Sequence, residues 1–302
     1  MGVPAPTTAA RCLAEAVGTF LLVFFGCGAV HSAVLTGAQS GLWQVAIVWG
    51  VAVTVAVYVV GGISGAHINP AITAALTVWG RFPARLVLPY VAGQLAGAMT
   101  AALVLFGLFQ PFLDAREKER GVERGQPGSE VTATCYGEYF PNPGPVSTDP
   151  TLKSADAVRR ALEEQRSQFG AVPAFLAEVM GTLILALVVF ALTDEHNLVA
   201  PAAGLGPVFI GLTVAILISV LGPLTQACLN PARDFGPRLV AWAVGWGEVA
   251  LPGPRPPAFL TVYILAPVLG ATLGGGLYAG LLRRCLPAAR QDVPAGRVPE
   301  ES

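Results

Sequence analysis

The sequence is short of charged residues. Asp, Glu, Lys and Arg make up 12% of its 302 residues, whereas soluble domains carry about 25%. The formal net charge of −1 also argues against a nucleic-acid partner, which would favour a basic surface. Hydrophobic residues account for 54% of the chain. This composition predicts a membrane protein whose main surroundings are the lipid bilayer.

Cysteine and histidine are sparse as well. The five Cys and three His show no CxxC or HxxH spacing, which argues against a metal site and against a disulfide framework. The sequence also lacks a visible nucleophile–base pair, so an intramembrane enzyme is a weak interpretation. We therefore expect no metal, no cofactor and no covalent chemistry.

Long apolar runs are abundant. A membrane-spanning helix needs about 20 mainly apolar residues. The segments that qualify are about 12–35, 43–61, 86–109, 173–193, 202–221 and 257–282. Two shorter apolar segments, about 70–79 and 231–243, each begin at an Asn-Pro-Ala triplet. Asn is a good helix N-cap and Pro suits the first turn, so we predict an all-α membrane protein with six transmembrane helices and two half-helices.

The two halves of the chain repeat each other. Residues 14–19 of the first span match residues 177–182 of the fourth, and the triplet at 69–71 matches the triplet at 230–232. Each half contains three full spans, so the second half must enter the membrane from the opposite side, which makes an inverted repeat. We expect a single membrane domain with a first repeat at 12–109, a connection at 110–172 and a second repeat at 173–282.

The arginine distribution predicts the orientation. The arginines expected on the side of both termini are Arg11, Arg81, Arg85, Arg283, Arg284, Arg290 and Arg297. The positive-inside rule makes this side cytoplasmic, although the 110–172 connection carries eight Lys and Arg on the other side. Long loops weigh little in that rule.

The connection is the one polar region between the repeats. Within it, we predict a flexible stretch at 115–130, a turn at 142–144 and a short surface helix at 156–168. The tail at 287–302 is predicted to be disordered.

Non-helical backbone is expected before each triplet, at 64–68 and 225–229. At membrane depth such backbone is tolerated only where protein buries it or where it lines a water-filled path. Its carbonyls would accept hydrogen bonds from a passing solute. The half-helices would meet N-terminus to N-terminus, where their positive dipole ends and the Asn69 and Asn230 amides would repel cations and interrupt proton hopping.

Two acidic residues lie inside predicted spans at matching positions of the repeat. Because an intramembrane carboxylate is costly, Glu15 and Glu178 are functional candidates. Each could accept backbone N–H groups from its own non-helical loop and anchor it, or each could be an interfacial residue. An ion-coupled secondary transporter, which also uses inverted repeats and broken helices, would need such acids for its coupling ion.

These features together resemble the major intrinsic protein family, the aquaporins and glycerol facilitators. The resemblance rests on two Asn-Pro-Ala triplets in an inverted repeat, Ser-Gly-Ala-His at 64–67 and Arg233 after the second triplet. It covers about 12–109 and 173–282. It implies the aquaporin fold, a passive channel and a homotetramer with one pore per subunit.

The residues after the second triplet look like the glycerol-facilitator branch. Asp234 follows the Arg, and Arg238 lies four residues further on. Asp234 is thus a subgroup marker, although an acid is also favourable in the first turn of any helix. Tyr263 in the last span is more typical of water channels, so the markers conflict.

The family's constriction of four side chains falls by motif on Trp49, Ile218, Ala227 and Arg233. Water-selective members have His where this chain has Ile218, and typical glycerol facilitators have Gly there and an aromatic residue at Ala227. Trp49 could instead be an interfacial belt residue, and Ile218 could face lipid. Arg233 is least open to such an interpretation, because a charge near the midplane must face water or a partner.

The sequence therefore predicts a passive channel for glycerol and other small uncharged solutes, among them urea and metalloid acids, with water. The alternatives are a water-selective channel and, less favoured, an ion-coupled transporter. The predicted pore residues are Asn69, Pro70, Ala71, Asn230, Pro231 and Ala232 at the triplets, with lumen carbonyls at Gly65, Ala66, His67, Ile68, Thr225, Gln226 and Cys228.

Overall fold

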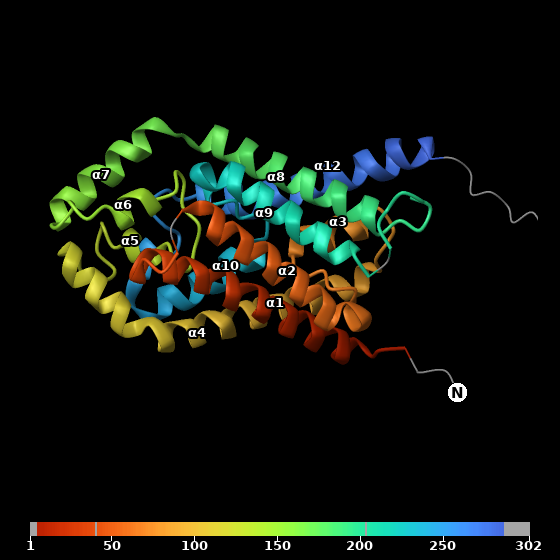
Figure 1. The fold of residues 1–302 in the computed structure, drawn as a ribbon, viewed down its shortest axis with the longest axis horizontal. Helices are drawn as coiled ribbons and strands as arrows, with labels where there is room; N and C mark the ends of the chain where they lie inside the picture. Colours follow the sequence, from red (N-terminus) through yellow and green to blue (C-terminus); the bar gives the residue numbers. More distant parts are fainter. Residues whose placement is uncertain (1–4, 40, 203, 287–302) are drawn as a thin grey trace, which may run out of the picture.

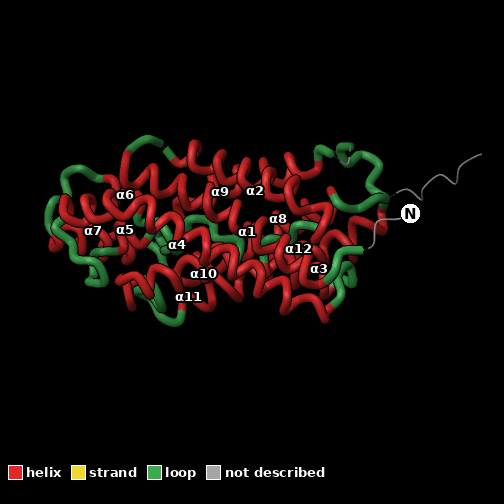
Figure 2. The backbone as a smooth tube through the Cα atoms, turned by 90° about the horizontal axis from the view of Figure 1, so that it is seen from below, coloured by secondary structure: helices red, strands yellow, loops and turns green. Residues whose placement is uncertain are grey.

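The computed structural model describes residues 5–39, 41–202 and 204–286, and these residues form helices and loops without a β-strand (Figure 2). The helical segments long and apolar enough to cross a membrane are Thr8–Thr36, Leu42–Ser64, Ala84–Arg120, Ala171–Leu192, Gly206–Thr225 and Ala258–Cys285. Two half-length helices, α3 (Pro70–Val78) and α10 (Pro231–Ala241), begin at the triplets. The prediction of an all-α fold with six spans and two half-helices is confirmed.

The spans consist mainly of α-helix. The long helices are α1 (Thr8–His31), α2 (Leu42–Ser64), α4 (Val87–Arg120), α8 (Ala171–Leu192), α9 (Gly206–Thr225) and α12 (Ala266–Gly276). Tighter or wider helical turns belong to the spans at η1 (Ser32–Thr36), η2 (Ala84–Leu86), η5 (Thr261–Leu265), η6 (Leu277–Leu281) and η7 (Leu282–Cys285), and two more follow half-helix α10 at η3 (Trp242–Trp246) and η4 (Gly247–Val249). The remaining short helices are α5 (Glu130–Ala133), α6 (Gly144–Thr148), α7 (Ala155–Gln168) and α11 (Ala258–Leu260).

The helices form an elongated bundle with distinct ends. The described ends of the chain, at the start of α1 and beyond α12, lie at the same end of the bundle (Figure 1). Helices α5, α6 and α7, which belong to the 110–172 connection, gather at the opposite end (Figure 1). This arrangement places the connection over one mouth of the bundle and the termini beside the other.

The prediction of a flexible stretch at 115–130 in the connection is wrong. Helix α4 continues past its predicted end at 109 to Arg120, where Gly121 stops it with a φ of 62°. Arg124 then folds back over the helix and pairs with Asp114 at 2.6 Å and Glu117 at 2.9 Å. Residues 129–140 are buried throughout. The opposite charges that suggested solvation are used in pairs that order this segment.

Other parts of the connection agree with the sequence. The short surface helix predicted at 156–168 is α7, and Ser154 caps its first turn. At the predicted turn of 142–144, the Asn142 side chain accepts a hydrogen bond from the Gly144 N–H at 2.8 Å. The predicted disordered tail, from residue 287 onward, lies outside the described residues.

Close helix packing follows the repeat. A Cβ at Gly97 on α4 would collide with the Ala16 carbonyl on α1, and a Cβ at Gly274 on α12 would collide with the Leu183 carbonyl on α8. Bare glycine backbone lets these helix pairs approach closely. The two halves then meet along α2 and α9, where Gly50 and Gly211 face each other's backbone. The inverted repeat is therefore visible in the packing as well as in the sequence.

Candidate pore

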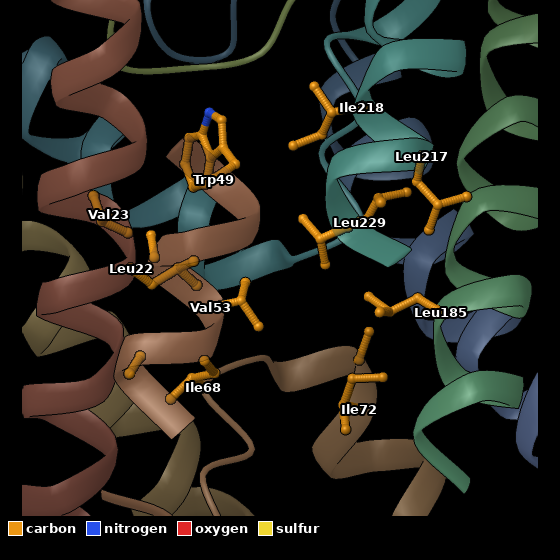
Figure 3. Close-up of a cluster of buried hydrophobic side chains, with 14 of the residues drawn as sticks. Leu22, Val23, Trp49, Val53, Ile68, Ile72, Leu185, Leu217, Ile218 and Leu229 are labelled. Carbon is orange, nitrogen blue, oxygen red and sulfur yellow. The ribbon is translucent and has the colours of Figure 1, made fainter. Parts of the chain in front are cut away.

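A cavity of about 870 Å³ lies between the two halves of the bundle. Residues from α2, α8 and α9 and from both non-helical loops line it, and Asn69 and Asn230 lie on its wall. Much of the wall is apolar, with Leu22, Val53, Ile72, Leu185 and Leu229 among its residues (Figure 3). An apolar wall interrupted by polar groups suits a solute that carries both carbon and hydroxyl groups.

The non-helical loops before the triplets share an unusual backbone. Left-handed φ values occur at Gly65, Ala66 and Ile68 in the first loop and at Gln226, Ala227 and Leu229 in the second. Five of these six residues are not glycine, and each such conformation costs about 1–3 kcal/mol. A strained loop of this kind persists only where its surroundings hold it. Here the two intramembrane acids hold it.

Glu15 and Glu178 lie behind the loops and are fully buried. The Glu15 carboxylate accepts the N–H groups of His67 at 2.9 Å and of Ile68 at 2.7 Å. The Glu178 carboxylate accepts the N–H groups of Cys228 at 2.9 Å and of Leu229 at 2.8 Å. Because both loops make the same contacts, each half of the repeat carries its own anchor.

The anchor of the first half has further donors. Ser64 Oγ lies 2.6 Å from Glu15 Oε1, and Gln94 Nε2 donates to Glu15 Oε2 at 2.7 Å. Tyr90 Oη donates to the Ser64 carbonyl at 2.8 Å. The first loop is therefore tied to both α1 and α4.

The triplet asparagines link the two halves at the centre of the cavity. Asn69 Nδ2 donates to the Leu229 carbonyl, and Asn230 Nδ2 donates to the Ile68 carbonyl, both at 2.8 Å. The side-chain oxygens cap the half-helices by accepting the Ala71 and Ala232 N–H groups at 2.8 and 3.1 Å. An amide NH₂ has two hydrogens, so each Asn keeps one donor beyond this exchange.

The structure brings together the four residues predicted for the constriction. Trp49, Ile218, Ala227 and Arg233 all line the cavity and are nearly inaccessible from outside the chain. Trp49 on α2 faces Ile218 on α9 (Figure 3). The Arg233 guanidinium lies over the Trp49 ring, 4.2 Å from its centroid. The belt position considered for Trp49 and the lipid-facing position considered for Ile218 are both inconsistent with this placement.

Arg233 has a partner that the sequence did not suggest. Its Nη1 forms an ion pair with Oε1 of Glu138, a fully buried residue of the 110–172 connection. Burial raises the pKa of Glu138 to about 8, and the Arg233 guanidinium acts in the opposite direction. Glu138 does not line the cavity, so it contacts the guanidinium from behind.

Asp234 and Arg238 hold the segment that carries Glu138. Asp234 accepts the Glu138 backbone N–H at 2.6 Å and pairs with Arg238 Nε at 2.8 Å. Arg238 in turn donates to the Glu138 carbonyl. The next residue, Tyr139, donates its N–H to Gln226 Oε1 at 2.7 Å. The acid that served as a subgroup marker is thus a structural contact between α10 and the connection.

A family model described as major intrinsic protein matches residues 4–278 of this sequence. The chain belongs to the major intrinsic protein family. Within this family it is 39% identical to a glycerol uptake facilitator protein of Pseudomonas aeruginosa over 99% of this chain and 97% of that protein. It is 39% identical to the propanediol uptake facilitator PduF of Citrobacter freundii, over 92% of this chain and 94% of that protein.

A solved structure of the same family confirms the fold. The X-ray structure of the aquaglyceroporin from Plasmodium falciparum superposes with a TM-score of 0.74. The superposition covers 93% of this chain and 99% of the Plasmodium falciparum chain, and the two sequences are 22% identical. The aquaporin fold is therefore shown for this major intrinsic protein, which is a multi-pass membrane protein.

The lumen differs in detail from the sequence prediction for this family member. Gly65, Ala66, His67 and Cys228 line the cavity, whereas Thr225 and Gln226 do not. The Gln226 side chain accepts the Tyr139 N–H instead. The carbonyls of Ile68 and Leu229 already accept hydrogen bonds from the triplet asparagines.

Sequence reasoning missed Glu138 and the residues that surround Glu15. A usable signal was present for Glu138, since residues 135–140 read Cys-Tyr-Gly-Glu-Tyr-Phe, a lone acid within an apolar and aromatic run of a polar connection. Such a run predicts burial, and a buried acid requires a partner. Gln94, by contrast, is one polar residue in a long span, and no pattern assigns its partner.

Proposed function

We propose that this protein is a passive channel for glycerol and other small uncharged solutes, and that water also passes. The observation that carries the proposal is the lumen itself, where the donors of Arg233 and of the two triplet asparagines interrupt an otherwise largely apolar wall. A polyol presents hydroxyls to these donors and carbon to the apolar wall. The protein's relatives that are named as glycerol and propanediol uptake facilitators support this choice of solute class.

The constriction residues support a polyol over a purely water-selective channel. Arg233 offers fixed guanidinium donors to solute hydroxyls, while Trp49 and Ile218 form an apolar wall for the carbon backbone. Ala227 leaves space where a larger residue would narrow the lumen. A water filter would be expected to have a more polar lining and a smaller bore.

Ion exclusion is proposed to arise at the centre of the lumen. Half-helices α3 and α10 direct their N-termini toward each other, and each carries roughly half a positive charge there. The remaining donors of Asn69 and Asn230 orient a central water by its oxygen, so that water cannot relay a proton along the file. Neutral solutes do not encounter this electrostatic barrier.

The contacts of the buried acids argue against an ion-coupled transporter. Glu15 and Glu178 already accept backbone N–H groups of their loops, and these contacts occupy both carboxylate oxygens of each residue. A coupling ion would have to displace them. The triplet loops would then lose their anchors, which does not suit a reversible transport step.

Reconstituted vesicles test the proposed function. Stopped-flow light scattering on proteoliposomes should show downhill flux of glycerol and water that does not saturate at low concentration. Dissipating the proton and sodium gradients should leave the flux unchanged. Water flux without glycerol flux would support the water-selective alternative, and uptake that depends on an ion gradient would support a transporter.

We also propose that both termini are cytoplasmic and that the protein is a homotetramer. The arginines of the termini and of the connection after α3 support the orientation. The cavity lies between the two halves of a single chain, which supports one pore per subunit. Reporter fusions at each terminus test the orientation, and native mass spectrometry in detergent tests the tetramer.

A further inference from the structure

A second guanidinium lines the cavity, toward the mouth beside the chain termini. Arg81 follows the end of half-helix α3, which lies toward the end of the bundle that carries the described ends of the chain (Figure 1). Arg81 and Arg233 both belong to the wall of the same cavity. A solute that crosses the lumen therefore passes one guanidinium on each side of the triplet asparagines.

Groups from the second half of the chain hold the Arg81 guanidinium in place. Its Nη1 donates to the Phe190 carbonyl at 3.1 Å, and its Nη2 pairs with Asp194 Oδ2 at 3.4 Å. The guanidinium also lies over the Phe190 ring, 4.6 Å from its centroid. These contacts use two of the five N–H groups of an arginine side chain. The side chain is 22% exposed, so the other N–H groups are free to meet a solute.

The acid that pairs with Arg81 has no free acceptor to offer. Asp194 also accepts Arg283 Nε at 3.0 Å and the His196 N–H at 3.0 Å. It therefore fixes Arg81 and leaves the donors of Arg81 as the polar groups that are available at this point of the wall. The neighbouring wall is apolar, with Leu76 and Leu192 among its residues.

We infer that Arg81 is a second solute-binding residue, whose free guanidinium N–H groups donate to the hydroxyls of a polyol at the mouth beside the termini. This inference rests on the proposed function. A hydroxyl that leaves bulk water loses hydrogen bonds, and leaving them unmade is costly. A rigid guanidinium replaces them with donors that are already oriented, and the apolar neighbours contact the carbon skeleton.

The number of hydroxyls determines how strongly a solute depends on Arg81. Glycerol and 1,2-propanediol share a three-carbon skeleton, and glycerol has one hydroxyl more. Loss of a donor therefore slows glycerol more than propanediol. A wider or narrower bore, or a smaller number of folded copies, changes the two fluxes in about the same proportion.

The test compares Arg81→Met with the unmodified protein in proteoliposomes, by stopped-flow light scattering with each solute. Met is a flexible, unbranched side chain and has no N–H donor. Asp194 keeps Arg283 and His196 as partners, so the substitution leaves no unpaired buried charge. We expect the ratio of glycerol flux to propanediol flux to fall about threefold, as the loss of one hydrogen bond predicts. An unchanged ratio would overturn the inference, whatever the absolute fluxes.

Arg85→Met is the matched control. Arg85 belongs to the same link between α3 and α4, but it is exposed and does not line the cavity. Its substitution should leave the ratio unchanged. A fall equal to that of Arg81→Met would assign the effect to the loss of positive charge at this mouth and would count against a binding role of Arg81.

The unmodified protein separates this inference from the proposed function. If it passes no glycerol, the proposed function is wrong. If it passes glycerol and Arg81→Met keeps the same ratio of the two fluxes, the proposed function stands and only the role of Arg81 is wrong.

Discussion

Four side chains are proposed to form the constriction of the lumen. Ile218 and Ala227 come from α9 and from the loop after it, and both line the cavity with Trp49 and Arg233. Neither carries a hydrogen-bonding side chain, so Arg233 supplies the polar contact at this level. Solute preference should therefore respond to a change in the size and polarity of these two residues.

The double substitution Ile218→His with Ala227→Cys should shift selectivity toward water. A His adds a polar group to the apolar wall, and a Cys occupies space that Ala leaves open. We expect the ratio of glycerol to water flux to fall about tenfold in stopped-flow measurements. His in place of Ile216, which is 57% exposed on the same helix, should leave the ratio unchanged. Undiminished glycerol flux in the double variant would contradict the assigned constriction.

The selectivity of the unmodified protein should depend on pH through Glu138. The charged and titratable groups around this carboxyl are Arg233, Asp234 and Arg238 on α10 and Glu178 on α8. Because burial raises the pKa of Glu138 to about 8, the carboxyl gains a proton as the pH falls through that value. Protonation removes the charge that pairs with Arg233, so the glycerol-to-water flux ratio should change between pH 9 and pH 6 in the unmodified protein and stay constant in Glu138→Gln. An equal pH response in Glu138→Gln would place the titrating group elsewhere.

Individual helices are positioned by glycine-mediated contacts. Gly97 on α4 lies against the α1 backbone, whereas a Cβ added at Gly107 on the same helix would meet no atom within 4 Å. Gly97→Ala should lower the thermal stability of the detergent-solubilised protein by several degrees, because α1 and α4 must separate. Gly107→Ala should have no such effect, since Ala favours the helix. Equal melting temperatures for the two variants would argue against close packing at Gly97.

The course of the helices was largely predictable, because hydropathy and the caps are local properties of the sequence. Both half-helices begin at their predicted Asn caps. The prediction failed at the end of α4 and beyond it, where Arg124 pairs with acids of the preceding helix. Charged residues in a connection look solvated until their partners are known. The four constriction residues could be predicted from a family motif. The contact of Glu138 with Arg233 could not, because the two residues lie 95 positions apart and no local pattern links them.

At the scale of the whole molecule, each half of the repeat holds its own non-helical loop through a buried acid, Glu15 or Glu178. The halves are not equal in strength. Ser64 contacts Glu15 and Thr225 contacts Glu178, but Glu15 also accepts a hydrogen bond from Gln94 on α4. The pair of acids could be predicted from the repeat, but the additional donor Gln94 could not. This difference has a measurable consequence for stability.

Replacing either anchor by Gln should destabilise the protein, and Glu15→Gln more than Glu178→Gln. The amide keeps one acceptor oxygen and turns an NH₂ group toward backbone donors. Each buried donor left without a partner costs about 1–3 kcal/mol, and more donors converge on Glu15. Thermal unfolding in detergent measures the order. Equal losses, or a larger loss for Glu178→Gln, would contradict the additional role of the first anchor.

The hydrogen bonds from Asn69 to the Leu229 carbonyl and from Asn230 to the Ile68 carbonyl lie at the centre of a lumen whose two mouths differ. In the described part of the chain, the proposed Trp49–Arg233 constriction lies toward the mouth covered by the connection, which contacts Arg233 through Glu138. A solute therefore meets its steps in a different order in each direction. Microscopic reversibility nevertheless requires a passive path to have the same permeability both ways at equal concentrations. The asymmetry can determine on which side of the asparagines a solute spends more time, but the direction of net flow is set by the solute's concentration gradient and not by this protein.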